Sequence, residues 1–200
     1  MSVVPPGGTP GPVLRVHDFL AESYANGPGK RAVIWMQGCP LACPRCWNPG
    51  LQDPGGGRAV GIESLVGRLL ALPDIEGLTI SGGEPTEQAA PLALLLETVR
   101  RQTDLSVLLF SGRTKARIKA MAGGSRLLAA TDVLVDGPYD HRLANADGAW
   151  PASANQNILF LTDRYTIFDF ADLPGLEIFI RPDGTIVTTG ILGVGSIACL

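Results

Sequence analysis

Three cysteines near one another are the residues of this chain with the clearest chemical potential. Cys39, Cys43 and Cys46 are spaced C-x3-C-x2-C. Pro40 and Pro44 lie between them, and because proline interrupts helices, we expect this segment to form a loop. A loop this short can direct three thiolates at one centre, and iron–sulfur clusters are usually held by four cysteine thiolates. The spacing therefore predicts a cluster held by three cysteines, with one iron left open to bind another molecule, as an open coordination site serves catalysis in zinc enzymes.

Two other interpretations of the cysteines remain open. Three thiolates and a histidine can form a structural zinc site, although neither His17 nor His141 has the spacing of a zinc knuckle. Free cysteines can also fill a core without any ligand. A fourth cysteine, Cys199, lies one residue from the end of the sequence, and we do not expect it to be a ligand.

A second segment with chemical potential contains Gly82, Gly83 and Glu84, followed by Pro85. Two adjacent glycines after a strand allow a ligand to approach the backbone closely, because glycine has no Cβ. A carboxylate at Glu84 can accept hydrogen bonds from an ammonium group. The same composition also fits an ordinary turn. Ser111 and Asp136 begin similar turns after two later strands, where an ordinary turn is an equal alternative.

Hydrophobic periodicity predicts the elements that position these motifs. Apolar runs indicate strands at 32–36, 78–80, 105–110, 133–135 and 158–161. Helical spacing indicates helices at 62–72, 88–101 and 114–121. Two further strands, 177–180 and 185–188, are expected to pair through the turn at 182–184.

The alternation of strands and helices predicts an α/β fold with a parallel sheet and helices outside it. The number of βα units fits a partial (open) TIM-like barrel of parallel βα units, and an open doubly wound sheet fits as well. In both architectures chemistry collects at the carboxyl ends of the strands, which is where the motifs fall.

Composition limits the classes of function. The 200 residues fit one domain, and we expect a flexible, Pro- and Gly-rich lead-in over residues 1–12 and a folded domain over 13–200. The formal net charge of -3 offers no basic surplus for nucleic acid. No apolar stretch has the length of a membrane span, and the N-terminus lacks a secretory pattern. We therefore expect a cytoplasmic location, no nucleic-acid partner and no membrane partner.

The two motifs together resemble the signature of the radical S-adenosylmethionine (SAM) superfamily. The resemblance implies that Cys39, Cys43 and Cys46 hold a [4Fe–4S] cluster whose open iron binds SAM, which is cleaved reductively to methionine and a 5′-deoxyadenosyl radical. It implies that Gly82, Gly83 and Glu84 bind the amino group of SAM. Ser111 is a candidate for its ribose or carboxylate. Trp47 is a candidate for an apolar face near the cluster, and Asp136 for contact with substrate or for shaping the site.

Further segments resemble the activating proteins of glycyl-radical enzymes, in particular those of anaerobic ribonucleotide reductase. The matching stretches are Glu22–Arg31, Cys46–Pro49, Ser81–Gln88, Val133–Tyr139, Asn155–Gln156 and Asp183–Gly190. This resemblance implies that the enzyme abstracts hydrogen from a glycine of a partner glycyl-radical enzyme. It also implies a flavodoxin or ferredoxin as electron donor.

Two alternatives to that function remain. Residues 151–154 read Pro-Ala-Ser-Ala, where the activating proteins usually carry Arg-Gly-Ser-Ser. This departure favours a radical SAM enzyme that modifies a small molecule or a peptide in a biosynthetic pathway. The third hypothesis is a metal-stabilised interaction module without catalytic activity, in which the glycine motif would have no ligand to bind.

Overall fold

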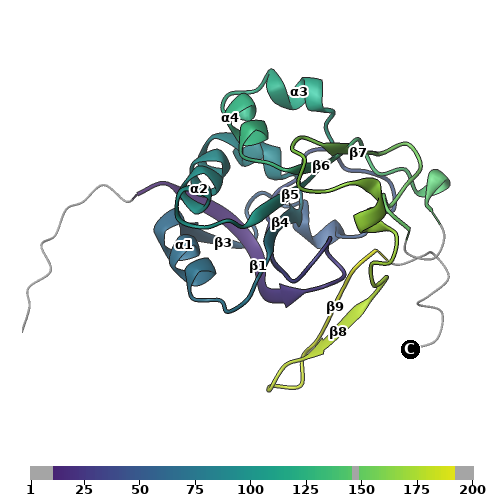
Figure 1. Cartoon of the computed structure of the whole chain (residues 1–200). Coiled ribbons are helices and arrows are strands. Elements are labelled where there is room, and N and C mark those ends of the chain that lie inside the picture. Colours follow the sequence, from purple (N-terminus) through teal and green to yellow (C-terminus); the bar gives the residue numbers. More distant parts are fainter. Residues whose placement is uncertain (1–10, 146–148, 192–200) are drawn as a thin grey trace, which may run out of the picture.

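A mixed β-sheet with helices along one side organises the chain (Figure 1). The structure is a computed structural model and describes residues 11–145 and 149–191. Its strands are β1 (Val13–Ser23), β2 (Arg31–Met36), β3 (Arg58–Gly61), β4 (Gly77–Gly82), β5 (Ser106–Ser111), β6 (Val133–Asp136), β7 (Asn157–Phe160), β8 (Glu177–Ile180) and β9 (Ile186–Thr189). Its α-helices are α1 (Ile62–Leu70), α2 (Ala89–Gln102), α3 (Lys115–Lys119) and α4 (Gly124–Ala129). Short 3-10 segments are η1 (Pro49–Leu51), η2 (Pro85–Gln88), η3 (His141–Leu143) and η4 (Ile167–Phe170).

Four parallel strands form the centre of the large sheet, in the order β2-β4-β5-β6. Each crossover between them carries at least one helix: α1, then α2, then α3 and α4. Successive crossovers move in one direction across the sheet, and crossovers of this kind are almost always right-handed, so their helices gather on one face. In agreement, α2 contacts both α1 and α4 (Figure 1).

The two faces of the sheet differ in what they bury. Leu78 and Ile80 of β4 pack into the main core beneath the helices, whereas Ser81 projects to the opposite face and lines a cavity. β5 alternates in the same way, with Leu109 in the main core and Phe110 lining the cavity. Side chains of a strand point alternately to the two faces. The helix side therefore holds the main core, whereas the other side holds the cavity beside a smaller buried cluster of Leu108, Val133, Val135 and Phe170.

The edges of the sheet correct the prediction of a purely parallel arrangement. β1 pairs antiparallel with β2, β3 antiparallel with β1, and β7 antiparallel with β6. A parallel pair needs a crossover long enough to return the chain to the starting end of the sheet. Only residues 24–30 join β1 to β2, which is too short for that return. The fold is thus a mixed α/β fold with a parallel-rich sheet.

Most predicted elements are present within one or two residues of their expected bounds, but β1 and β3 in the sheet and helix α4 were not predicted from the sequence. The eleven-residue β1 was missed because its side-chain alternation is interrupted. Leu14 and Val16 are buried in the main core, but a register shift between Val16 and Asp18 breaks the two-residue period. Such a bulge hides a strand from a search for strict alternation.

The C-terminal strands form a separate two-stranded hairpin, as predicted. β8 pairs antiparallel with β9, so that Phe179 lies opposite Val187 and Ile180 opposite Ile186. Figure 1 shows this hairpin projecting from the body, away from the helices.

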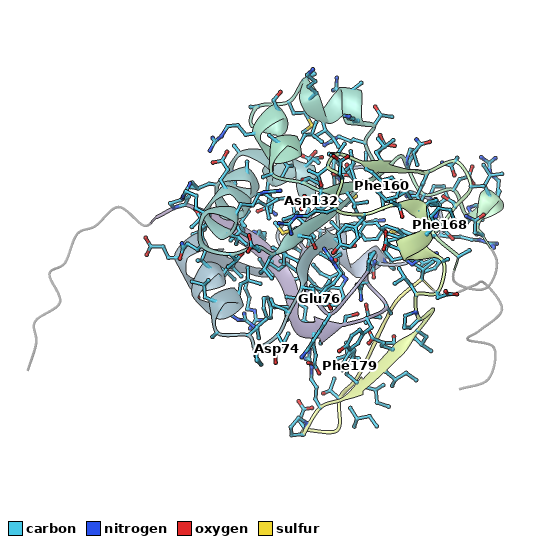
Figure 2. The ribbon with its side chains drawn as sticks, viewed as in Figure 1. Asp74, Glu76, Asp132, Phe160, Phe168 and Phe179 are labelled. Atoms are coloured by element: carbon cyan, nitrogen blue, oxygen red, sulfur yellow. The ribbon has the colours of Figure 1, made fainter. Side chains whose placement is uncertain are left out.

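The buried carboxylate of Asp132 joins three elements (Figure 2). It accepts hydrogen bonds from Arg100 Nη2 on α2 at 3.0 Å, from the Val107 amide on β5 at 2.8 Å, and from the Thr162 hydroxyl just after β7 at 2.8 Å. Because all these donors converge on one buried group, Asp132 fixes α2 against the sheet.

A fully buried arginine, Arg31, fills the opposite end of the parallel strands. Its guanidinium donates to the Thr79 hydroxyl at 2.8 Å, to the Ser106 hydroxyl at 3.0 Å and to the Leu78 carbonyl at 2.9 Å. Burial lowers the pKa of Arg31, since desolvation disfavours its charged form. These bonds close the amino-terminal end of the strands with side chains and leave the carboxyl end for the site.

No helix within the described residues is long and apolar enough to cross a membrane. The predicted lead-in falls almost wholly on residues 1–10, and Cys199 falls on residues 192–200; both stretches lie outside the described residues.

Candidate active site

A cavity of about 700 Å³ opens at the carboxyl ends of the parallel strands, on the face opposite the helices. Eight of the nine predicted site residues line it. They are Cys39, Cys43, Cys46, Trp47, Gly82, Gly83, Glu84 and Ser111. The fold thus brings together motifs that are separated by more than seventy residues of sequence.

Backbone hydrogen bonds close the cysteine loop at its base. The Gly38 amide donates to the Leu51 carbonyl at 2.8 Å, and the Cys39 amide donates to the Gln52 carbonyl at 3.0 Å. Within the loop, the Cys46 amide donates to the Cys43 carbonyl at 3.1 Å. The loop therefore leaves β2 and returns to the same point, which holds the three cysteines at the rim of the cavity.

Two residues of this loop have left-handed backbones. Ala42 has φ of 46° and Arg45 has φ of 54°, a region that non-glycine residues rarely occupy. Each precedes one of the later cysteines, Cys43 and Cys46. The turns they create keep the segment from becoming a helix, in which the three cysteines would follow one another along one face instead of surrounding one centre.

The three thiols are free and partly buried. Burial raises the pKa of the Cys39 and Cys43 thiols, because desolvation disfavours the thiolate. A bound metal reverses this preference, since a coordinating thiol is deprotonated.

The donor set fits an iron–sulfur cluster. Among the described residues, no three His, Cys, Asp or Glu side chains converge as ligands of a single metal ion do. A cluster is larger than one ion and takes each thiolate on a different iron atom. Three thiols on one loop beside an open cavity match that requirement.

The double glycine is required by close packing between β4 and the cysteine loop. A Cβ on Gly83 would lie 2.4 Å from the Gly38 carbonyl oxygen, and one on Gly82 would lie 2.4 Å from the Met36 nitrogen. The Glu84 amide donates to the same Gly38 carbonyl at 2.8 Å. The glycine motif therefore supports the start of the cysteine loop directly.

Glu84 lines the cavity although its side chain is fully buried. Its Oε1 accepts from the Thr86 amide at 3.0 Å, the Thr86 hydroxyl at 2.6 Å and the Ser111 hydroxyl at 2.8 Å. Its Oε2 accepts from the Gly112 amide at 2.8 Å. Since a carboxylate oxygen offers about two lone pairs, Oε1 is saturated, whereas Oε2 can take another donor.

The direction in which the Thr86 and Ser111 hydroxyls donate can be deduced from their contacts with Arg113. Arg113 donates to the Thr86 hydroxyl oxygen at 3.2 Å from Nη1 and to the Ser111 hydroxyl oxygen at 3.0 Å from its backbone amide. Each hydroxyl therefore accepts from Arg113 and donates to Glu84. Ser111 thus acts on the site through Glu84 as well as by its place on the cavity wall.

Asp136 is the one predicted site residue that does not line the cavity. Its buried carboxylate accepts from the Lys115 amide at 2.6 Å and from Asn157 Nδ2 at 2.8 Å. These bonds join the end of β6 to the start of α3 and to β7. The next residue, Gly137, does line the cavity, so Asp136 shapes the wall from behind.

Trp47 lies at the cavity rim in edge-to-face contact with Tyr139, with ring centroids 5.7 Å apart. Tyr139 follows β6 and lines the cavity as Trp47 does. The aromatic pair therefore links the cysteine loop to the far side of the cavity.

Several cavity residues were not predicted. They include His17 and Asp18 of β1, Asn26, Tyr139, Ala152, Gln156 and residues 187–191. Tyr139 and Gln156 belong to the stretches that resemble the activating proteins, but their residue types alone indicate no role in a site. His17 and Asp18 were missed because β1 itself was missed.

Comparisons with known proteins give the family. Residues 25–159 match the family described as 4Fe-4S single cluster domain. The anaerobic ribonucleoside-triphosphate reductase-activating protein of Pasteurella multocida is 32% identical over 152 residues, an alignment that covers 72% of this chain and 96% of that protein. The protein of the same description from Vibrio cholerae is 30% identical, with 72% and 97% covered. The pyruvate formate-lyase-activating enzyme of Clostridium pasteurianum is 34% identical over 93 residues, with 44% and 39% covered.

The chain therefore belongs to the 4Fe-4S single cluster domain family, in the group of radical SAM enzymes that activate glycyl-radical enzymes. A [4Fe–4S] cluster and SAM are the cofactors that this membership implies. The predicted family, enzyme class and cofactors are thereby confirmed.

Proposed function

We propose that this enzyme generates a glycyl radical on a partner enzyme similar to anaerobic ribonucleoside-triphosphate reductase. The observation that carries the proposal is the cavity in which three thiols and the Glu84 carboxylate face a common space. Proteins described as activating that reductase are similar over nearly their whole length, which supports this choice of partner.

Cys39, Cys43 and Cys46 are the proposed cluster ligands. Three protein thiolates would leave one iron of a bound [4Fe–4S] cluster free for SAM, and the reduced cluster would supply the electron that cleaves SAM to methionine and a 5′-deoxyadenosyl radical. The residues of this chain bind and orient SAM and keep water from the cavity. The radical takes a hydrogen atom from a glycine Cα of the partner, leaving 5′-deoxyadenosine and a glycyl radical.

Glu84 is the proposed acceptor for the SAM ammonium group, through the remaining capacity of Oε2. Four donors within the protein give this buried carboxylate hydrogen-bond partners. Gly82 and Gly83 would allow the methionine part to approach the backbone, and Trp47 would offer an apolar face beside the cluster. Ser111 is proposed to position the Glu84 carboxylate by its hydrogen bond. Asp136 is proposed to position the end of β6, which forms part of the cavity wall.

Further parts of the proposal concern the surroundings of the site. A flavodoxin or ferredoxin is the proposed electron donor, and a cytoplasmic location would keep the thiols reduced. We interpret the parallel strands with helices on one side as a partial barrel of the radical SAM type, whose inner face is the cavity wall.

The second candidate is modification of a small molecule or peptide. The segment 151–154, which departs from the activating proteins, contributes Ala152 to the cavity wall. A substrate would meet the methyl group of Ala152 where the run of the activating proteins carries a glycine, and Pro151 stands in place of the arginine.

An anaerobic assay with reduced enzyme, SAM and the anaerobic ribonucleoside-triphosphate reductase of the same cells separates the two functions. The proposal predicts 5′-deoxyadenosine formation that rises with added reductase, and a glycyl-radical signal on the reductase. SAM cleavage that is unaffected by the reductase, with no radical on it, would support the small-substrate function instead.

A further inference from the structure

The β8–β9 hairpin has two unlike faces. Phe179 and Val187 lie opposite each other and are only partly exposed. On the other face, Ile178, Ile180 and Ile186 are 51%, 75% and 64% exposed. We call these three residues the isoleucine face. Figure 2 shows Phe179 on the side of the hairpin nearer the body.

The hairpin is fastened to the body, so its position is fixed. Glu177 accepts a hydrogen bond from the Ser23 hydroxyl, and also from the Tyr24 amide at 2.9 Å and the Ala25 amide at 3.1 Å. Near the turn, Arg181 Nη2 lies 2.8 Å from Asp18 Oδ2. Because the hairpin is held in place, its apolar face is already arranged for contact with another molecule.

The isoleucine face meets the cavity rim at one residue, Thr188. Thr188 lies opposite Ile178 in the hairpin and so belongs to the same face. Thr188 also lines the cavity, together with its neighbours Val187 and Thr189. Since Val187 and Thr189 belong to the other face, β9 borders the cavity with both of its faces, and a larger molecule that inserts a segment there comes close to the hairpin.

The exposed apolar side chains are concentrated beyond the segment that matches the family. Among the described residues, six of the eleven exposed large hydrophobic side chains fall between residues 167 and 186, whereas the family match ends at residue 159. They are Ile167, Phe168, Leu176, Ile178, Ile180 and Ile186. Soluble proteins rarely gather exposed apolar groups unless they bind something there.

We propose that the isoleucine face is a docking surface for the partner enzyme whose glycine enters the cavity. This inference rests on the proposed function, because a protein substrate must cover the rim while its glycine lies inside. The face carries no charged side chain, so the matching surface of the partner is apolar and uncharged, adjacent to its glycine-bearing loop.

The test compares Ile180→Glu and Ile186→Glu with Leu70→Glu. Leu70 is also an exposed apolar residue, but it lies on α1, on the helix side of the sheet (Figure 1). The reductase is titrated, and its binding, its glycyl-radical yield and reductase-independent SAM cleavage are measured separately. We expect each hairpin variant to need about tenfold more reductase for half-maximal binding, since burying a charge in an apolar contact is costly. Leu70→Glu should match the wild type, and all variants should cleave SAM alone at the wild-type rate.

The outcomes separate the docking surface from the proposed function. Normal radical formation with unchanged half-saturation in both hairpin variants would overturn the docking surface and leave the function standing. Binding that depends on Ile180 without radical formation would support the surface and overturn the function. Absence of any binding by the wild type would overturn both.

Two other occupants of the face give different results. If Ile180→Glu changes the sedimentation of the free enzyme, a second copy covers the face. If it lowers the melting temperature of the free enzyme, residues 192–200 of the same chain cover it. Either result would overturn the inference.

Discussion

The cysteine loop and the glycine motif act as one unit at the scale of single residues. The Gly38 carbonyl accepts from the Glu84 amide, and the absence of a Cβ at Gly83 makes room for that carbonyl. The two motifs were recognised separately in the sequence. Their contact could not be predicted, because it depends on the pairing of β2 with β4.

Gly83→Ala tests this contact. The added Cβ would meet the Gly38 carbonyl oxygen at 2.4 Å, and neither backbone can move without disturbing the loop or the sheet. We expect a loss of about 1–3 kcal/mol in the free energy of unfolding and a lower iron content after reconstitution. Gly50→Ala is the matched control, because nothing lies within 4 Å of its added Cβ. Equal stability and iron content in the two variants would contradict the contact.

Glu84→Gln tests the role of the buried carboxylate. The variant loses the charge that is proposed to bind the SAM ammonium group. The amide NH2 of the glutamine also replaces one carboxylate oxygen, so that some of the protein donors around it lose their acceptor. We expect SAM affinity to fall by at least about tenfold, with the cluster still assembled, and stability to fall by about 1–3 kcal/mol. Glu87→Gln changes a carboxylate in the same turn that does not line the cavity. Calorimetric titration with SAM should separate the two variants, and wild-type affinity in Glu84→Gln would refute the assignment.

The thiols offer a test that depends on pH. Because burial raises the pKa of Cys39 and Cys43, each carries less thiolate than a free cysteine at the same pH. In the metal-free protein, their alkylation by iodoacetamide at pH 8 should be slower than that of a single cysteine in an unstructured peptide. As the pH is raised further, the alkylation rate of Cys39 and Cys43 should still increase at a pH where the rate of the reference thiol is already constant. Peptide mass spectrometry measures each site, and rates equal to the reference would show that burial has no such effect.

At the scale of elements, the sequence predicted the regular βα units and missed the irregular ones. α1 and α2 were found because their apolar residues recur at helical spacing and pack into one core. β1 was missed because of its bulge, and with it the antiparallel edge of the sheet. The direction of β7 was also missed, because pairing direction depends on where the chain returns and not on the residues of the strand.

Asp132→Ala tests how α2 is held against the sheet. Removing the carboxylate leaves the Val107 amide and the Thr162 hydroxyl without their acceptor, and Arg100 without its buried partner. We expect a loss of about 3 kcal/mol in the free energy of unfolding. Asp104→Ala, a nearby exposed change, should cost less than about 0.5 kcal/mol. Chemical denaturation measures both, and similar midpoints would contradict the role of Asp132.

At the scale of the whole molecule, the arrangement explains how one sheet serves both stability and chemistry. The helix side carries the main core, and Arg31 with its hydrogen bonds closes the amino-terminal end of the strands. The cavity is thereby confined to the carboxyl ends, where the motifs gather. The sequence predicted this location from the order of elements. It did not predict that β1 and β9 complete the cavity wall, since both come from outside the βα units.

The central claim is that three thiolates hold the cluster and leave one iron for SAM. Electron paramagnetic resonance of the reduced, reconstituted enzyme, recorded with and without SAM, tests it most directly. The account predicts a [4Fe–4S] signal that changes when SAM is added, and no such signal in Cys43→Ala. A signal that SAM does not alter, or a protein that binds zinc and assembles no cluster, would contradict it.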